Sequence, residues 1–181
     1  MKFSALTTIA TAITAATAAP VKRVVGTVSF TDAISNMKLN LVTNDASIPV
    51  GLSNGVLTAD QDPITVDFLL GDFQFMNFEN TDNTKFGHIV NSGTQQALTV
   101  NSPGAAQGQN IYFSESSISD DSSQMLQYWE LNADMQVRFL GAPKGAEFGQ
   151  GPFTPESQNE GDGLAIALNT NTAASFVLEQ Q

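Results

Sequence analysis

The side chains of this sequence that could carry out chemistry are led by His88, the only histidine in the chain. A serine triad needs an imidazole as its base, so any such triad would have to include this residue. His88 lies in a run of strand-forming residues between Gly87 and Ile89, and no Gly-X-Ser-X-Gly sequence of a nucleophile elbow occurs. We therefore predict a structural strand histidine, either paired or exposed, and no catalytic residue.

Carboxylates are the other chemically active groups, because two of them at a suitable separation can hydrolyse a glycosidic bond. Eighteen Asp and Glu residues are available, but their order in the sequence singles out no pair. Asp60-Gln61-Asp62 and Glu160-Gly161-Asp162-Gly163 are rich enough in acids for calcium, but neither completes a twelve-residue ligand loop. One histidine and no cysteine also fall short of the usual zinc ligand sets. We predict no metal and no cofactor.

Two neighbouring aromatic residues, Tyr128 and Trp129, are candidates for contact with carbohydrate. Successive side chains of a strand point to opposite faces, so one ring is expected inside the protein while the other can stack on a sugar. Core packing is the expectation for Trp129.

The elements that must position these residues are short antiparallel strands. Apolar and polar residues alternate over short runs bounded by Gly, Asn, Asp and Pro, and no long window has a helical period. Asn54-Gly55 predicts a type I′ turn, because both central positions of that turn need positive φ. One helical turn is allowed within Ser114–Gln127, and two long loops are expected, at Asn101–Asn110 and Gly141–Gly163. The predicted strands are Val25–Phe30, Met37–Val42, Ile48–Leu52, Ile64–Leu70, Phe73–Phe78, Phe86–Val90, Ala97–Val100, Ile111–Phe113, Met125–Leu131, Gln136–Leu140, Leu164–Leu168 and Ser175–Leu178.

These strands predict one all-β domain of about eleven or twelve antiparallel strands, folded as a barrel, for example a trefoil-like one, or as a sandwich. Phe73 and Phe75 are expected in its core. Asn-containing turns recur at separations of 37, 41 and 37 residues, which is typical of a duplicated hairpin unit. Hairpins of any all-β chain recur at similar spacing, and we favour that simpler explanation. The turns begin at Asn54, Asn91, Asn132 and Asn169.

The first residues are typical of a secretory signal peptide. A single Lys2 precedes an apolar stretch rich in Ala and Thr, and Ala16-Thr17-Ala18 provides the small residues that a signal peptidase requires. The dibasic pair Lys22-Arg23 follows and matches the sites of furin- or kexin-like proteases. We predict a signal peptide over 1–18, a short pro-segment over 19–23 and a secreted domain over 24–181.

The predicted domain is strongly acidic. Residues 24–181 carry four basic side chains and all eighteen acidic ones, a formal charge of −14. Such a charge repels phosphate backbones and anionic lipid heads, so nucleic acid and membranes are excluded as partners. Cysteine is absent, so packing alone must stabilise a domain that the oxidising exterior would allow to form disulfides.

Three stretches occur in a familiar order: Ser53–Asp60 (SNGVLTAD), Gly71–Phe75 (GDFQF) and Tyr128–Gly141 (YWELNADMQVRFLG). They resemble the C-terminal domain of PIR-type fungal cell-wall proteins and the related small secreted wall proteins of filamentous fungi. The resemblance implies a secreted, non-enzymatic structural protein of the wall or matrix. The chain departs from the family in having no cysteine and none of the glutamine-containing repeats through which PIR proteins are thought to be ester-linked to glucan.

The sequence therefore favours an extracellular cell-wall or matrix protein that is held noncovalently, by wall glucan, or released. Two alternatives stay open. A lectin-like carbohydrate-binding module would use Tyr128 or exposed Phe rings as stacking platforms, and a secreted glycoside hydrolase would need two converging acids.

The first testable expectation concerns processing. The secreted protein should begin at Val24 or close to Ala19, because the small-residue site and the dibasic pair both lie there. Mass spectrometry of the exported chain measures this directly, and an exported form that keeps Met1 would contradict it.

Overall fold

The computed structural model describes residues 26–102, 109–147, 151–157, 164–167 and 174–180. Over these residues the chain forms fourteen strands and one 3-10 helix, which confirms the predicted all-β class. Two of the strands are only two residues long, so the other twelve agree with the predicted number. Ala18, Lys22, Arg23 and the rest of the predicted signal peptide and pro-segment lie outside the described residues.

The elements follow one another closely along the chain. In order they are β1 (Gly26–Thr27), β2 (Phe30–Val42), β3 (Ser47–Ser53), β4 (Val56–Ala59), β5 (Thr65–Gly71), β6 (Thr84–Asn91), β7 (Ala97–Val100), β8 (Gln109–Ser114), β9 (Ser119–Asp120), the helix η1 (Ser122–Leu126), β10 (Trp129–Asn132), β11 (Gln136–Phe139), β12 (Thr154–Ser157), β13 (Leu164–Ala167) and β14 (Ser175–Gln180).

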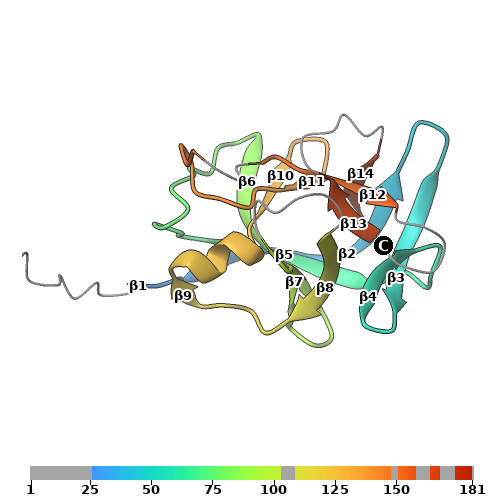
Figure 1. Cartoon of the computed structure of the whole chain (residues 1–181), viewed down its shortest axis with the longest axis horizontal. Coiled ribbons are helices and arrows are strands. Elements are labelled where there is room, and N and C mark those ends of the chain that lie inside the picture. Colours follow the sequence, from blue (N-terminus) through green and yellow to red (C-terminus); the bar gives the residue numbers. More distant parts are fainter. Residues whose placement is uncertain (1–25, 103–108, 148–150, 158–163, 168–173, 181) are drawn as a thin grey trace, which may run out of the picture.

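Six of these strands close into a barrel. Each pairs antiparallel with the next in the order β2, β14, β11, β10, β6 and β5, and β5 pairs back onto β2. Figure 1 shows β6, β10, β11 and β14 beside one another along this ring. Closure leaves the six barrel strands without a free edge, which removes a site for pairing with other chains.

Three hairpins complete the fold. They are β3–β4, β7–β8 and β12–β13, and β8 pairs with both β4 and β13, so the hairpins meet one another. A unit of two barrel strands and one hairpin is thus used three times, as β2–β5, as β6–β8 with β10, and as β11–β14. This pairing pattern is that of a β-trefoil, and it selects the trefoil-like barrel among the predicted architectures.

The threefold repeat does not coincide with the recurring turns of the sequence. Asn54-Gly55 joins the two strands of a hairpin, the turn after Asn91 joins β6 to β7, and the turn after Asn132 joins the second unit to the third. The turn at Asn169 lies outside the described residues. The turns therefore occupy unequal positions of the unit, and their spacing is incidental although a repeat exists. The type I′ prediction is supported, since Asn54 and Gly55 have φ of 50° and 79°.

The predicted strand Phe73–Phe78 is wrong. Residues 74–77 form a turn in which the amide of Asn77 donates to the carbonyl oxygen of Phe73 at 3.2 Å. The buried side chains are therefore Phe73 and Met76, three residues apart, and not alternate residues of a strand. Phe73 is in the core as predicted, whereas Phe75 is only half-buried at its edge.

Other elements also differ from expectation, and strand β4 is not among the predicted strands. The predicted strands Val25–Phe30 and Met37–Val42 correspond to the short β1 and to a thirteen-residue β2 that continues through a bulge. The first half of the predicted strand Met125–Leu131 is instead helix η1 and its C-cap, within the segment where a helical turn was allowed. Strand β12 lies inside the predicted loop Gly141–Gly163. Its four residues pair with β13.

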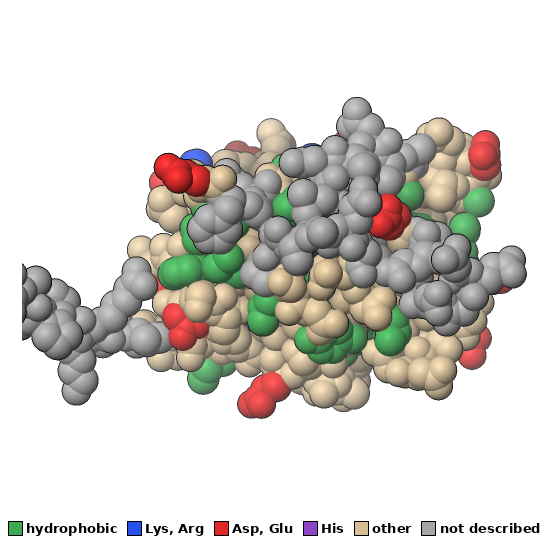
Figure 2. Space-filling view, in the orientation of Figure 1, with side chains coloured by type: hydrophobic (Ala, Val, Ile, Leu, Met, Phe, Trp, Pro, Cys, Tyr) green, Lys and Arg blue, Asp and Glu red, His purple; other side chains and the backbone are tan. Residues whose placement is uncertain are grey.

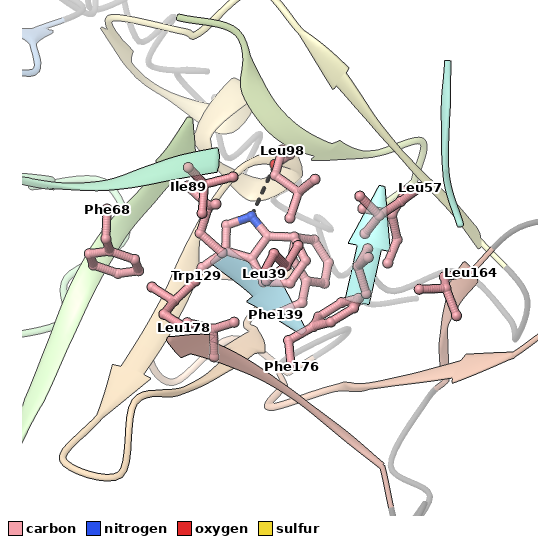
Figure 3. Close-up of a cluster of buried hydrophobic side chains, with 14 of the residues drawn as sticks. Leu39, Leu57, Phe68, Ile89, Leu98, Trp129, Phe139, Leu164, Phe176 and Leu178 are labelled. Atoms are coloured by element: carbon pink, nitrogen blue, oxygen red, sulfur yellow. Dashed lines mark hydrogen bonds between the residues drawn. The ribbon is translucent and has the colours of Figure 1, made fainter. Parts of the chain in front are cut away.

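The main core fills the barrel and the space beneath the hairpins. Trp129, Phe139 and Phe176 are fully buried here, and Figure 3 shows their rings converging from three barrel strands. In the strand register Trp129 is opposite Gly87, and a Cβ on that glycine would lie 1.9 Å from the carbonyl oxygen of Leu69. Only glycine allows β5 and β6 to approach so closely beside the indole ring.

A second, smaller core lies outside the barrel, and we call it the outer cluster. It contains Val28, Phe73, Met76, Phe86, Tyr128 and Leu140. Tyr128 packs edge-on against Phe73 with ring centroids 4.8 Å apart, and stacks on Phe86 at 6.2 Å. The outer cluster covers β6 at Phe86, and β6 is buried on both faces from Phe86 to Val90, whereas the outward residues of β10 are only half-buried.

The fold predicts unequal costs for two phenylalanine truncations. Phe139→Ala should lower the free energy of unfolding by about 3–5 kcal/mol, because the ring is 1 % exposed in the main core. Phe75→Ala should cost only about 1–2 kcal/mol, because that side chain is half-buried. Urea unfolding of both variants measures this, and equal losses would contradict the difference in burial between the two rings.

Candidate functional site

The described residues contain one buried polar network, and His88 is at its centre. His88 is 0 % exposed on β6, where it pairs in register with Leu69, and the rings of Phe30 and Phe73 lie 5.3 and 5.2 Å from its imidazole. It is therefore a paired strand histidine, the first of the two predicted states. Its Nδ1 lies 3.0 Å from the hydroxyl of Ser116, and its Nε2 lies 2.6 Å from Oε1 of Gln124.

The hydrogen bonds of Gln124 fix the tautomer of His88. The amide nitrogen of Gln124 donates to the carbonyl oxygens of Ser117 and Ser119, at 3.1 and 2.7 Å. Its Oε1 must then accept, so the imidazole carries its proton on Nε2. Nδ1 is left as an acceptor, and the hydroxyl of Ser116 donates to it. The result is a neutral imidazole with both nitrogens satisfied.

Gln127 holds the same segment from a second side. Its Oε1 accepts from the amide of Ser117 at 2.9 Å, and its amide nitrogen donates to the carbonyl oxygen of Glu115 at 2.8 Å. The same nitrogen also lies 3.1 Å from the hydroxyl of Thr99. His88, Thr99, Gln124 and Gln127 are four of the five buried polar residues in the described part of the chain.

These contacts fix the stretch Glu115–Ser119, which we call the serine segment. It connects β8 to β9, and the helix η1 that follows carries Gln124. Asp121 caps that helix, since its Oδ1 accepts from the amide of Ser123 at 2.8 Å. The carbonyl oxygen of Ile118 accepts from the amide of Val28 at 2.8 Å, so the chain before β2 also holds the segment. In Figure 1, β1, β9 and the helix lie together at one side of the molecule.

An open hollow of about 340 Å³ is lined by the serine segment. Its lining has one carboxylate, from Glu115, three serines and the side chain of Ile118, which is 58 % exposed. The hydroxyl of Ser117 forms a hydrogen bond of 2.6 Å with the hydroxyl of Ser123. The hollow thus combines hydrogen-bonding groups with an exposed apolar side chain on a backbone that buried amides hold in place.

Tyr128 and Trp129 do point to opposite sides, as the alternation predicted, but both are buried. Trp129 is 0 % exposed in the main core, where its Nε1 donates to the carbonyl oxygen of Leu98 at 3.0 Å (Figure 3). Tyr128 is 1 % exposed in the outer cluster. Neither ring has a face open to solvent, so neither side chain can stack on a sugar in this structure. The expectation of core packing for Trp129 is confirmed.

Two acids lie close to the hydroxyl of Tyr128. Burial raises the pKa of Tyr128, and the negative charges of Asp120 and Asp72 raise it further. Asp120 accepts from the amide of Phe75 at 2.9 Å, and Asp72 accepts from the side chain of Gln74. Both carboxylates are therefore used to hold the turn that carries Phe73 over the outer cluster.

No group of three or more His, Cys, Asp or Glu residues that could hold a metal occurs in the described part of the chain. The stretch from Glu160 to Gly163 lies outside it. In the part of the chain that the structure describes, no helix has both the length and the apolar composition of a membrane span.

Sequence reasoning found His88 but missed its partners. Its partners Ser116 and Gln124 lie 28 and 36 residues further along the chain, Gln127 of the same network lies 39 residues further, and no motif links these residues to His88. The one available signal is the low apolar content of Ser114–Gln127, the stretch in which the sequence allows a helical turn.

Comparison with known proteins gives no further assignment: no protein-family model matches the sequence, and no curated protein does. The likeness to PIR-type wall proteins stays a prediction from the three motif stretches.

The network predicts how stability responds to acid. Burial lowers the pKa of His88 from 6.5 to about 4, and the hydrogen bond to Gln124 offsets only part of this effect. Between those values the unfolded chain binds more protons than the folded chain, so stability is lost as the pH falls from about 6.5 to about 4. The full loss is up to about 3 kcal/mol from this group.

Because the chain has a single histidine, NMR titration of the imidazole in an untagged protein reports on His88 alone. We expect no titration between pH 8 and pH 5.5. The midpoint should lie near pH 4, because burial lowers the pKa of His88 from 6.5 to about 4. A midpoint close to 6.5 would show that the imidazole is not enclosed as described.

Proposed function

We propose that this chain is a secreted, non-enzymatic protein of a cell wall or extracellular matrix, and that it binds neutral polysaccharide through the serine segment. The observation that carries the proposal is the hollow over Glu115–Ser119, whose backbone is held by two buried glutamines. A site that is ordered before binding does not lose conformational entropy when the ligand arrives.

The lining of the hollow favours a polyhydroxylated ligand. Sugars present hydroxyl groups that donate and accept, together with apolar C–H faces. Glu115 and the hydroxyl oxygens of the serines supply acceptors for the hydroxyls, and the exposed part of Ile118 supplies an apolar contact. The platform is therefore an aliphatic side chain, in place of the aromatic one expected at Tyr128 or Trp129.

The charge of the chain favours a neutral polymer. Acidic side chains are spread singly over the face shown in Figure 2, and basic ones are few there. An anionic polysaccharide would be repelled by a domain with a formal charge of −14 over residues 24–181. Hydrogen bonds and apolar contact with a neutral glucan are much less sensitive to salt.

A serine hydrolase is the second candidate, and the contact between Ser116 and His88 is the observation that favours it. Three features weaken it. The imidazole is enclosed by two phenyl rings, its low pKa makes it a weak base, and its other nitrogen faces the neutral amide of Gln124. A carboxylate at that place would stabilise the imidazolium formed in catalysis, and an amide cannot.

Retention on insoluble β-glucan tests the proposal. Binding should persist when the salt is raised from about 0.05 to 0.5 M, and a carboxymethylated form of the same glucan should bind less well. Glu115→Gln and Ile118→Ala should each weaken binding about fivefold, the effect of losing about 1 kcal/mol of contact.

Matched controls are available elsewhere on the surface. Glu79→Gln and Leu52→Ala change an exposed acid and an exposed apolar residue outside the serine segment, and they should leave binding unchanged. Equal binding by all four variants would remove the segment from the proposal, and failure of the unmodified protein to bind neutral glucan or chitin would remove the function. Covalent labelling of Ser116 by a fluorophosphonate would favour the hydrolase instead.

A further inference from the structure

A second concave site lies at a different place, where the β10–β11 turn meets the barrel. We call it the barrel-end pocket. It has a volume of about 400 Å³ and is lined by Ile34 and Met37 of β2, Met135 of the β10–β11 turn, and Leu178 and Gln180 of β14. Met37 and Leu178 belong to the main core, so the pocket opens directly onto it. None of these residues is part of the serine segment.

A β-bulge shapes one wall of the pocket. Residues three apart on a regular strand point to opposite faces, yet Ile34 and Met37 both line the pocket. The pairing of β2 with β5 shifts register between these two residues, and Asn36 between them has a φ of 58°. The amide of Asn36 donates to Oδ1 of Asp67 at 2.9 Å, which holds the bulge. The bulge thus turns a second apolar side chain toward the pocket.

A strained turn shapes the opposite wall. Met135 has a φ of 59°, a conformation that costs a side chain with a Cβ about 1 kcal/mol or more. Asn132 holds the turn, since its Oδ1 accepts from the amides of Asp134 and Gln136 at 3.0 and 2.9 Å. The carbonyl oxygen of Met135 also accepts from the amide of Leu178 at 2.9 Å. Two irregular backbone segments, far apart in sequence, therefore place side chains around one pocket.

The lining specifies the chemistry of a ligand. Four of the five side chains are aliphatic or thioether, none is charged, and Gln180 provides one amide. Methionine side chains are flexible and polarisable and adapt to varied apolar shapes. A water molecule occupies roughly 30 Å³ in the liquid, and on that scale a pocket of this size holds about a dozen non-hydrogen atoms. We propose that the barrel-end pocket binds a small neutral amphiphile, an apolar body with one hydrogen-bonding group that meets Gln180.

The neutral aromatic alcohol 2-naphthol has the required size and character and serves as the probe. In protein labelled at the methionine methyl groups, its ring should shift the NMR signals of Met37 and Met135 saturably, at concentrations below about 1 mM. Met76 and Met125 belong to or contact the outer cluster and act as internal controls. The ligand should also raise the melting temperature, because it binds the folded state.

Two pairs of variants complete the test. Ile34→Glu places a charge in the lining and should weaken binding at least about tenfold, whereas Leu52→Glu, which alters an exposed leucine outside the lining, should not. Met135→Gly removes one wall and relieves the positive φ, which offsets part of the packing lost against the main core, so it should stay folded and still bind more weakly. Gln95→Gly relieves a φ of 60° outside the pocket lining and should bind normally.

The proposal is overturned if the signals of Met37 and Met135 do not shift saturably, if Met76 and Met125 shift equally, if the ligand lowers the melting temperature, or if Met135→Gly binds as tightly as the parent. Failure of Ile34→Glu to fold leaves the methionine pair as the deciding comparison. None of these outcomes depends on whether the serine segment binds polysaccharide.

Discussion

The indole of Trp129 connects the parts of this fold. Its ring on β10 packs against Phe139 of β11 and Phe176 of β14, with centroids 5.2 and 6.3 Å away, and its Nε1 donates to Leu98 on the hairpin strand β7. One side chain thereby joins the barrel wall to a hairpin. In a chain without cysteine no covalent bridge could replace such packing, so barrel closure depends on this core.

The position of Trp129 also determines where His88 lies. The register places Trp129 opposite Gly87, so the next residue of β6 points out of the barrel, into the space beneath the outer cluster. A polar side chain there is stable only if its nitrogens are hydrogen-bonded. Ser116 and Gln124 meet that requirement, and Gln124 and Gln127 in turn hold the serine segment. The packing of Trp129 therefore places His88, and the buried amide of Gln124 that satisfies His88 also fixes the exposed serine segment.

The sequence predicted what depends on local pattern. Alternation gave most strands, and Asn54-Gly55 gave its turn, because both signals are contained in a few neighbouring residues. Prediction from the sequence failed where turns, bulges or contacts between distant residues, and not strand alternation, decide which side chains are buried. Phe73 and Phe75 alternate in sequence, but a turn buries Phe73 with Met76. The serine segment could not be predicted either, because no motif links Ser116 and Gln124 to His88, which lies 28 and 36 residues before them. The barrel-end pocket depends on a bulge that Asp67 holds from another strand.

The central claim is that the serine segment is rigid before any ligand binds, although it has no regular secondary structure apart from its last residue in β9. Native-state hydrogen exchange of the Ser117 amide tests this most directly, because that amide donates to Oε1 of the buried Gln127 and belongs to no strand. The account predicts that this amide exchanges as slowly as those of β6, and that Gln127→Leu makes it fast while the barrel amides stay protected. Rapid exchange of Ser117 in the unmodified protein, at the rate of an exposed loop, would contradict the claim.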